Sequence, residues 1–235
     1  MKLNTNSNTY ILAYASLLVI AVAFVLAYFS QALKPIQDKN VALDKKKQII
    51  AALNIRDVND NQVEEYYNKL VEADEIINEK NEVLSAGKPG GENDGFKLNG
   101  GDFKAGKLAL FVCNVDGQKK YVMPVYGMGL WGGISGYIAI NADKETIYGV
   151  YFNHEGETAG LGAEIKDNQK WQQQFCGKHL FAVGNQDAVA LSVCKKVDNP
   201  ATQVDGVSGA TLTCDGVTRM IHEGLGKYLV FLKDK

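Results

Sequence analysis

The residues best suited to chemistry lie in a short turn of small side chains. Residues 205–211 read Asp-Gly-Val-Ser-Gly-Ala-Thr, and a segment with apolar residues at helix-face spacing follows them. Gly206 and Gly209 tolerate backbone angles that other residues resist. A helix N-terminus favours an anion, so the turn is suited to a phosphate beside the Thr211 hydroxyl. A Gly-rich strand-to-helix turn that binds nothing is the alternative.

The helix expected after this turn is defined by its apolar face. The face consists of Val217, Met220, Ile221, Leu225 and Tyr228. Thr213 is the predicted N-cap, because a threonine hydroxyl can accept from a free N–H group of the first turn. We identify no catalytic base beside Thr211. This favours a residue that another enzyme modifies over a nucleophile that activates itself, and no catalytic residue is assigned.

Three motifs, in order along the chain, resemble a known family of flavin proteins. Residues 208–211, Ser-Gly-Ala-Thr, resemble the flavinylation motif of FMN-binding domains, and residues 157–162, Glu-Thr-Ala-Gly-Leu-Gly, resemble the Glu-Thr-x-Gly loop of that family. With residues 126–131, Tyr-Gly-Met-Gly-Leu-Trp, and an N-terminal anchor, the resemblance narrows to the C-subunit family of sodium-translocating NADH:quinone oxidoreductases. The G subunits of Rnf complexes share the flavin motif and the anchor, and they are the alternative family.

The resemblance implies a cofactor, a function and partners. In this family a separate flavin transferase joins FMN to the threonine at the position of Thr211 through a phosphoester. The implied function is that of an electron-carrier subunit in a sodium-transporting NADH:ubiquinone reductase, a translocase, with no activity expected of this subunit alone. The implied partners are the other subunits, the transferase and the lipid bilayer. A membrane-anchored binding module with an unmodified threonine is the non-redox alternative.

Several residues are candidates to contact FMN, and each has a structural alternative. The predicted cofactor-binding residues are Thr211, Ser208, Gly209, Ala210, Leu212, Thr213, Asp205, Glu157, Thr158, Gly160, Leu161, Leu130, Trp131 and Lys195. Glu157 and Thr158 either contact the flavin and its ribityl chain or cap the next helix. Asp205 either binds a metal or the transferase during attachment or shapes the turn. Lys195 either offsets phosphate charge or is an ordinary surface lysine.

Leu130, Leu161 and Trp131 are large apolar candidates for contact with the flavin ring. Leu130 and Leu161 either pack on the isoalloxazine ring or belong to the protein core. Trp131 either stacks on the ring or fills the edge of the core. In each case the flavin carries the electron chemistry, and the protein positions it.

Composition excludes several classes of protein. The chain has 235 residues, of which 46% are hydrophobic and 22% charged, as expected for one folded domain with an anchor. A formal net charge of −2 offers no basic field for nucleic acid. The cysteines lack Cys-x-x-Cys spacing and the three histidines are scattered, so no metal or iron–sulfur site is predicted. Disulfide pairing stays open.

Residues 10–29 are almost wholly apolar, with Ser16 as the one strongly polar side chain. Twenty residues at helical rise span about 30 Å, the thickness of a bilayer core. A cleaved signal peptide is the alternative, with residues 30–32 as the cleavage site, but its apolar region is usually only about 7–15 residues long. We therefore predict a retained membrane span after a short tail, residues 1–9.

The charges beside this span conflict with the resemblance about orientation. Lysines follow the span at positions 34, 39, 45, 46 and 47, whereas only Lys2 precedes it. The positive-inside rule would then place the large domain in the cytoplasm. The resemblance implies a single-pass protein of the bacterial inner membrane with a periplasmic flavin domain. We adopt the second orientation, because long domains can cross the membrane regardless of local charge.

The remaining pattern predicts the α+β class, with an antiparallel sheet and helices packed on it. Residues 30–84 are expected to form a juxtamembrane helical segment, in which a helix resumes after Pro35 and a polar helix covers residues 62–81. Glycine-rich residues 85–107 are expected to be an irregular connector. The FMN-binding domain is expected over residues 108–235.

Within this domain, strands are expected in pairs before the last helix. The expected strands cover residues 108–115, 120–125, 137–141, 146–152, 180–183 and 189–193. Asp116-Gly117 is a strong signal for a two-residue hairpin turn. A helix is expected over residues 164–175, with Trp171 and Phe175 one turn apart.

Overall fold

The structure is a computed structural model that describes residues 7–234. The chain divides after Asp44 into two compact units, which are described separately. Helix α1 (Asn8–Ala52) begins in the first unit and ends in the second, and Pro35 lies inside it. The expectation of a helix that resumes only after Pro35 is therefore wrong. A proline removes one backbone donor, and here the helix continues on both sides of that single loss.

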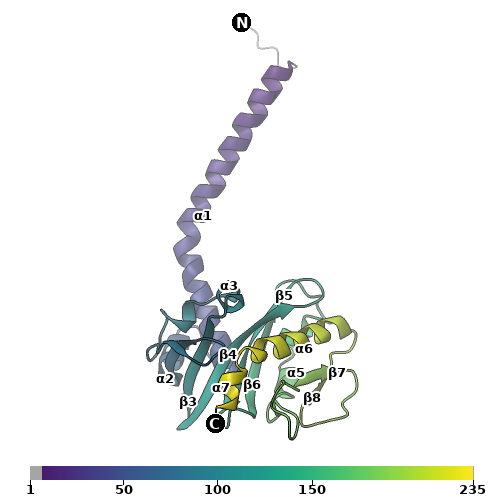
Figure 1. The fold of residues 1–235 in the computed structure, drawn as a ribbon. Helices are drawn as coiled ribbons and strands as arrows, with labels where there is room; N and C mark the ends of the chain where they lie inside the picture. Colours follow the sequence, from purple (N-terminus) through teal and green to yellow (C-terminus); the bar gives the residue numbers. More distant parts are fainter. Residues whose placement is uncertain (1–6, 235) are drawn as a thin grey trace. The chain divides into compact units, whose positions relative to one another are not determined.

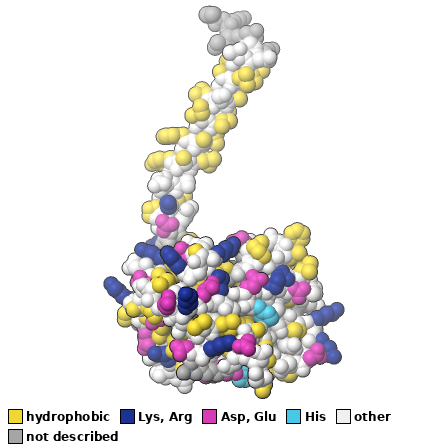
Figure 2. All heavy atoms as spheres, viewed as in Figure 1, with side chains coloured by type: hydrophobic (Ala, Val, Ile, Leu, Met, Phe, Trp, Pro, Cys, Tyr) yellow, Lys and Arg dark blue, Asp and Glu magenta, His cyan; other side chains and the backbone are white. Residues whose placement is uncertain are grey.

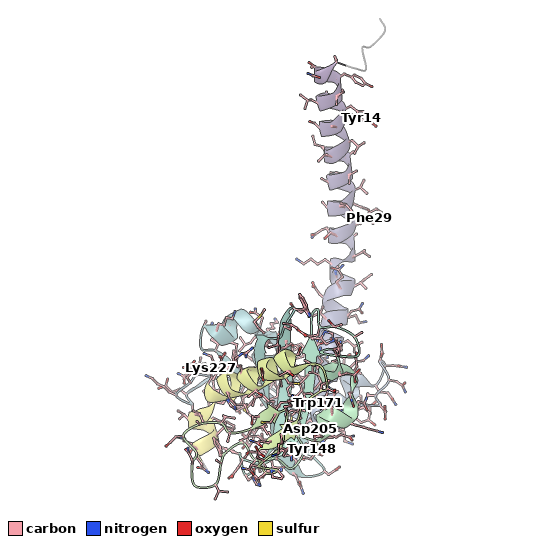
Figure 3. The ribbon with its side chains drawn as sticks, turned by 90° about the vertical axis from the view of Figure 1, so that its right-hand side faces the viewer. Tyr14, Phe29, Tyr148, Trp171, Asp205 and Lys227 are labelled. Carbon is pink, nitrogen blue, oxygen red and sulfur yellow. The ribbon has the colours of Figure 1, made fainter. Side chains whose placement is uncertain are left out.

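The first unit contains the predicted span. In the described part of the chain, α1 is the one helix that is long and apolar enough to cross a membrane, with a mean hydropathy of 2.5 in its most apolar window. Hydrophobic side chains run along this helix, and charged side chains of both signs cover the visible face of the second unit (Figure 2). Within the span, Tyr14 and Phe29 are both exposed (Figure 3).

The second unit is built on a six-stranded sheet, which Figure 1 shows with helices packed around it. The strands are β1 (Val71–Ile77), β2 (Val83–Ser85), β3 (Leu108–Val115), β4 (Gln118–Met128), β5 (Gly133–Asn141) and β6 (Ile147–His154). Their order is β2-β1-β3-β4-β5-β6, and every neighbouring pair is antiparallel. The predicted α+β class with an antiparallel sheet is confirmed.

The expected hairpin between β3 and β4 is present. Asp116 and Gly117 both have positive φ, 51° and 79°, as a type I′ turn requires. The first four expected strands are found as β3 to β6, the first with the expected bounds and the others longer or slightly shifted. Alternation and turn chemistry are local signals, so the sequence was sufficient to predict them.

The helix expected over residues 62–81 is wrong in its second half. Helix α2 (Val63–Leu70) ends where β1 begins, and β1 pairs with β3. Acidic residues made this stretch resemble the polar face of a helix, but the apolar and β-branched Val71 and Ile77 are buried against the sheet. The segment 30–84 is therefore not helical throughout, because β1 and β2 belong to the central sheet.

The long helix α6 (Thr211–Gly226) packs on the sheet, mainly against β4 (Figure 1). The predicted apolar face is buried at Val217, Met220, Ile221, Leu225 and also at Tyr228, which lies just beyond the helix. A Cβ at Gly224 would lie only 2.6 Å from Val125 Cγ1. This glycine therefore lets the helix approach the strand closely. A short helix, α7 (Leu229–Lys233), ends the described chain.

The segment between β6 and α6 differs from expectation. The helix expected over residues 164–175 is divided into α4 (Glu164–Asp167) and α5 (Gln169–Gln173), because the Asn168 side chain caps α5 by accepting from the Trp171 N–H at 3.1 Å. A parallel pair follows, β7 (Ser192–Cys194) and β8 (Gln203–Asp205).

The two strands expected at residues 180–183 and 189–193 are largely absent from the described structure. Ala182 forms only an isolated bridge, and β7 covers just the end of the second range. Leu180, Phe181, Val189 and Leu191 are buried in the core. Their apolar character therefore reflects packing and not a strand.

The Gly-rich residues 85–107 fold around one buried carboxylate. They include the short helices η1 (Gly95–Lys97) and α3 (Gly100–Lys104). Asp74 has no exposed surface and accepts from the N–H groups of Lys88, Asp94 and Phe96 at 3.1, 3.0 and 3.3 Å. A Cβ at Gly91 would lie 1.7 Å from Asp74 Oδ1, so only glycine fits there.

We predict that Asp74→Asn lowers the free energy of unfolding by about 1–3 kcal/mol, because an amide NH₂ would face backbone N–H donors. Urea denaturation followed by tryptophan fluorescence measures the change. The control is Asp143→Asn, since Asp143 accepts from Glu145 and Thr146 N–H groups in an exposed turn. Equal effects of the two substitutions would contradict the role assigned to Asp74.

Candidate functional site

The small-residue turn joins β8 to α6, and the sequence predicts the helix after the turn but not the strand β8 before it. Strand β8 ends at Asp205, and α6 begins at Thr211 with Ala210 at the N-cap position. The prediction of Thr213 as N-cap is wrong, because the helix begins two residues earlier and Thr213 lies in its first turn. None of the described residues caps this helix with a side chain. The N-terminal N–H groups therefore lack a side-chain acceptor, as suits an anion.

Thr211 is exposed beside a pocket of about 320 Å³. The pocket is lined by Val193, Cys194, Lys195, Asp205, Gly206, Val207, Ser208, Gly209, Thr211, Cys214 and Asp215. Gly209 has a φ of 76°, a left-handed conformation that favours glycine. The structure thus brings the predicted residues Lys195, Asp205, Ser208 and Thr211 around one cavity.

The buried Glu157 carboxylate joins the three motifs. Glu157 is 7% exposed, and its Oε2 accepts from Thr213 Oγ1 at 2.6 Å. Its Oε1 accepts from the Trp131 N–H at 2.9 Å, and its own N–H donates to His154 Nδ1 at 3.2 Å. The carboxylate therefore ties the loop of Trp131 and the first turn of α6 to the Glu157 loop.

Glycines in two of the motifs make room for this carboxylate. A Cβ at Gly129 would lie 2.4 Å from Glu157 Oε1, and a Cβ at Gly162 would lie 2.4 Å from Oε2. The Gly162 Cβ would also approach Thr213 Oγ1 to 2.6 Å. Neither position therefore has space for a side chain while Glu157 keeps its place.

Hydrogen bonds favour the ionised form of Glu157. Burial raises its pKa, but donors from Thr213 and from the backbone of Trp131 and Leu130 outweigh this effect. The pKa of Glu157 consequently lies below its ordinary value of 4.5. Because the folded pKa is lowered, the ionised carboxylate stabilises the fold above pH 4.5, and this contribution is lost as the pH falls through the folded pKa.

Four large apolar side chains in or next to the three motifs are exposed. Leu130, Trp131, Leu161 and Leu212 are 47%, 69%, 42% and 57% exposed. They are therefore not core residues, which removes the structural alternative for the first three. Leu161 lies against the turn, since a Cβ at Gly209 would be 2.8 Å from its Cδ2. We call Leu130, Trp131, Leu161 and Leu212 the apolar rim.

The remaining candidates have simpler surroundings. Thr158 is exposed, as is Gly160, and the Thr158 carbonyl accepts from the Leu161 and Ala163 N–H groups at 3.1 and 3.0 Å. Among the described residues no side chain caps α4, so the capping alternative for Glu157 and Thr158 is wrong. The structure describes no cluster of three or more residues that could hold a metal, and all four cysteines, each in the described range, carry free thiols.

Sequence reasoning missed two contributors to the turn. Cys214 Sγ accepts from the Val207 N–H at 3.3 Å, and Trp171 Nε1 donates to the Asp205 carbonyl at 2.8 Å. The spacing of Cys214 three residues after Thr211 places it on the first helical turn and was a usable signal. The contact of Trp171 depends on tertiary structure and left no sign in the sequence.

We predict that Glu157→Gln lowers the free energy of unfolding by about 1–3 kcal/mol at pH 7, because its NH₂ group would face a donor. The difference from the unsubstituted chain should shrink as the pH falls from 4.5 through the lowered pKa of folded Glu157, because Glu157 itself then becomes protonated. Urea denaturation at pH 7 and pH 3.5 checks both statements. Glu155→Gln, at an exposed neighbouring position, is the control and should change little. A deficit that stays constant with pH would be evidence against the carboxylate's role.

Comparison with known proteins adds to this geometry. The FMN-binding domain family matches residues 129–226. The C subunit of the Na(+)-translocating NADH-quinone reductase of Haemophilus ducreyi is 31% identical over 99% of this chain and 97% of its own length. Its counterpart in Pasteurella multocida is 31% identical over 92% of this chain and 91% of its own length.

Crystal structures of two relatives are among the solved structures that resemble this chain. The C subunit from Parabacteroides distasonis is 36% identical, with a TM-score of 0.78 over 86% of this chain and 98% of that chain. NqrC from Shewanella oneidensis is 26% identical, with a TM-score of 0.65 over 83% of this chain and 100% of that chain. Together with the spacing of the three motifs around Glu157, these similarities identify the chain as a member of the family of C subunits of Na(+)-translocating NADH-quinone reductases.

Proposed function

We propose that the chain is a membrane-anchored electron carrier of a Na(+)-translocating NADH-quinone reductase, with FMN joined to Thr211 through a phosphoester. The observation that carries this proposal is the place of Thr211. Thr211 is exposed at the first residue of α6, where it lines the pocket at a helix terminus without a side-chain cap among the described residues. The relatives are named as C subunits, which favours this family over the Rnf alternative.

The surroundings of Thr211 fit a phosphoester. Such a group keeps a negative charge, which the N–H groups and dipole of the α6 terminus stabilise. Lys195 lines the same pocket and offsets part of this charge. Ser208 is exposed in the turn, so its hydroxyl is available as a donor to phosphate oxygens. Asp205 adds a negative side chain at the pocket edge, and its proposed role is in recognition by the flavin transferase.

The apolar rim fits a flat aromatic ring. Its four side chains are exposed to solvent, and covering apolar surface is favourable by roughly 25 cal/mol per Å². Leu161 lies against Gly209, within the turn that ends at Thr211, so a ring tethered there is close to it. When bound, the flavin supplies the electron chemistry. The role of Leu130, Trp131 and Leu161 is to orient the ring and exclude water from one side of it.

In this proposal, the flavin receives electrons from partner subunits and passes them to partner subunits. The sequence has no nicotinamide fingerprint, and the described residues include no group of potential metal ligands that could hold a second redox centre. A tethered cofactor on a membrane anchor is suited to exchange with fixed neighbours. The isolated chain should therefore oxidise NADH negligibly, because its sequence lacks a nicotinamide-binding fingerprint.

We predict that Thr211→Val abolishes covalent flavin, because valine keeps the shape of threonine but has no hydroxyl to esterify. In-gel flavin fluorescence and the mass of the peptide around residues 202–219 measure the loss. Thr146→Val, which removes a threonine hydroxyl outside the three motifs, is the control and should retain the flavin. Normal fluorescence in Thr211→Val would move the attachment to another hydroxyl or return the chain to the class of unmodified binding modules.

In the assembled complex, Thr211→Val should stop the reduction of quinone by NADH. NADH should still reduce artificial acceptors that take electrons before they reach this subunit. The reason is that the substitution removes one carrier and leaves the NADH site intact. Steady-state assays with both acceptors on the purified complex make the comparison. Rapid NADH oxidation by the isolated chain would contradict the role of an electron carrier within a larger complex.

We further propose a single-pass inner-membrane protein with its flavin domain in the periplasm. Three of the five lysines that follow the span have partners in the folded second unit. Lys45 donates to the carbonyls of Phe96 and Leu98, and burial lowers its pKa to about 8. Lys46 pairs with Glu64 and Glu92, and Lys47 pairs with Asp60. These three lysines thus have partners inside the domain and need no contact with lipid headgroups.

This orientation predicts the behaviour of reporters fused after Lys235. A reporter that is active only in the periplasm should be active there, since the chain crosses the membrane once in this proposal. A reporter that works only in the cytoplasm is the matched control and should be silent. The opposite pattern would favour the orientation that the lysines indicate.

A further inference from the structure

Helix α5 holds the first residue of the flavin turn by both of its backbone groups. Trp171 Nε1 donates to the Asp205 carbonyl at 2.8 Å, and Gln174, the C-cap of α5, accepts from the Asp205 N–H through Oε1 at 3.3 Å. Figure 3 shows the labelled Trp171 and Asp205 near each other. Asp205 therefore has its main chain fixed while its side chain is exposed.

The Trp171 indole is itself held by packing. It is 4% exposed, and its ring centroid lies 5.9 Å from that of Phe152 on β6 and 5.3 Å from that of Phe175. Aromatic rings in such clusters have a fixed orientation, because close packing leaves no space for another rotamer. The indole N–H is thus directed at Asp205 by the hydrophobic core.

The next residue, Gln172, joins α5 to α4 by hydrogen bonds and, through Arg56, to β6. Gln172 has no exposed surface, and its Nε2 donates to the carbonyls of Ile165 and Lys166 at 2.8 and 3.1 Å. Its Oε1 accepts from Arg56 Nη2 at 2.8 Å, and the same nitrogen donates to the Val150 carbonyl on β6 at 2.7 Å. The guanidinium therefore links the sheet to α5 through the Gln172 amide.

The residues that follow Asp205 in the turn have separate supports. The Gly206 N–H donates to the Cys194 carbonyl at 2.9 Å, and the Val207 N–H donates to Cys214 Sγ at 3.3 Å. Ser208 and Gly209 are exposed. The entry to the turn consequently depends on α5, whereas its middle is held by β7 and α6.

We propose that Trp171 and Gln174 are positioning residues that set the flavin turn for attachment at Thr211, and that Arg56 acts on them through Gln172. This inference rests on the proposed function of Thr211. Loss of one of these hydrogen bonds gives Asp205 and the following residues additional conformations. Only the native conformation presents the Thr211 hydroxyl correctly, so the rate of attachment falls with its population.

The test compares matched substitutions in the full-length chain in detergent. Gln174→Leu removes the acceptor of the Asp205 N–H, Gln174→Glu retains an acceptor, and Gln173→Leu makes the same change at the neighbouring exposed position. Trp171→Phe removes the indole donor. Its control is Tyr228→Phe, which removes another buried donor, to the Ala109 carbonyl at 2.8 Å.

Two measurements are made on each variant. Hydrogen exchange of the peptide that covers residues 205–211 is recorded before flavin attachment, and the rate of flavinylation by purified transferase is recorded afterwards. We expect Trp171→Phe and Gln174→Leu to raise exchange by about threefold to tenfold, the change in the opening equilibrium constant that loss of one net hydrogen bond produces, and to slow attachment in proportion to the native population that is lost. Gln174→Glu, Gln173→Leu and Tyr228→Phe should match the unsubstituted chain in both.

Substitutions of Arg56 test the hydrogen bonds that join α5 to β6. Arg56→Met should change both measurements in the same direction, and Arg56→Lys, which retains a donor, should restore them in part. Unchanged exchange and attachment in Trp171→Phe and Gln174→Leu, or equal changes in the controls, would overturn the proposal. If the unsubstituted chain accepts no flavin, the proposed function fails, and the exchange measurement alone decides whether α5 positions the turn.

Discussion

The Glu157 carboxylate lies where three segments distant in sequence meet, and the geometry of the candidate site depends on it. A buried charge is costly unless hydrogen bonds satisfy it, and here Thr213 and the Trp131 N–H donate to its two oxygens. Gly129 and Gly162 stand where any side chain would collide with those oxygens. The glycines of two motifs and the acid between them therefore form a single packing arrangement. Its effect is to fix the loop of Trp131 against the first turn of α6.

The side chains of that first turn have two roles: some support the fold, and others face the proposed cofactor. Thr213 and Cys214 are buried, and they bond to Glu157 and to Val207 respectively. Thr211 and Leu212 are exposed on the other side, beside the pocket and within the apolar rim. Helical geometry produces this division, because neighbouring residues point in different directions. The buried side of the first turn of α6 is therefore fixed by hydrogen bonds, and its exposed side is accessible to a cofactor.

A second buried carboxylate organises the opposite end of the sheet in the same way. Asp74 on β1 accepts three backbone N–H groups from the Gly-rich segment, and Gly91 leaves room for it. Both acids connect irregular chain to regular structure through hydrogen bonds. Helix α5 supplies the third connection, through the main chain of Asp205. The irregular segments of the domain are thus ordered by a few side chains that are far from them in sequence.

The sequence by itself determined what depends on neighbouring residues. The apolar run of the span, the Asp116-Gly117 turn, the strands around it and the apolar face of α6 follow from local propensity and periodicity, and they place Thr211 at a helix N-terminus. Tertiary structure alone decided that β1 is a strand, since its pairing with β3 outweighs the helical pattern of its polar residues. It also decided the partners of the Glu157 carboxylate and the hydrogen bond from Trp171 to Asp205. These contacts join residues more than 25 positions apart, and no local pattern encodes them.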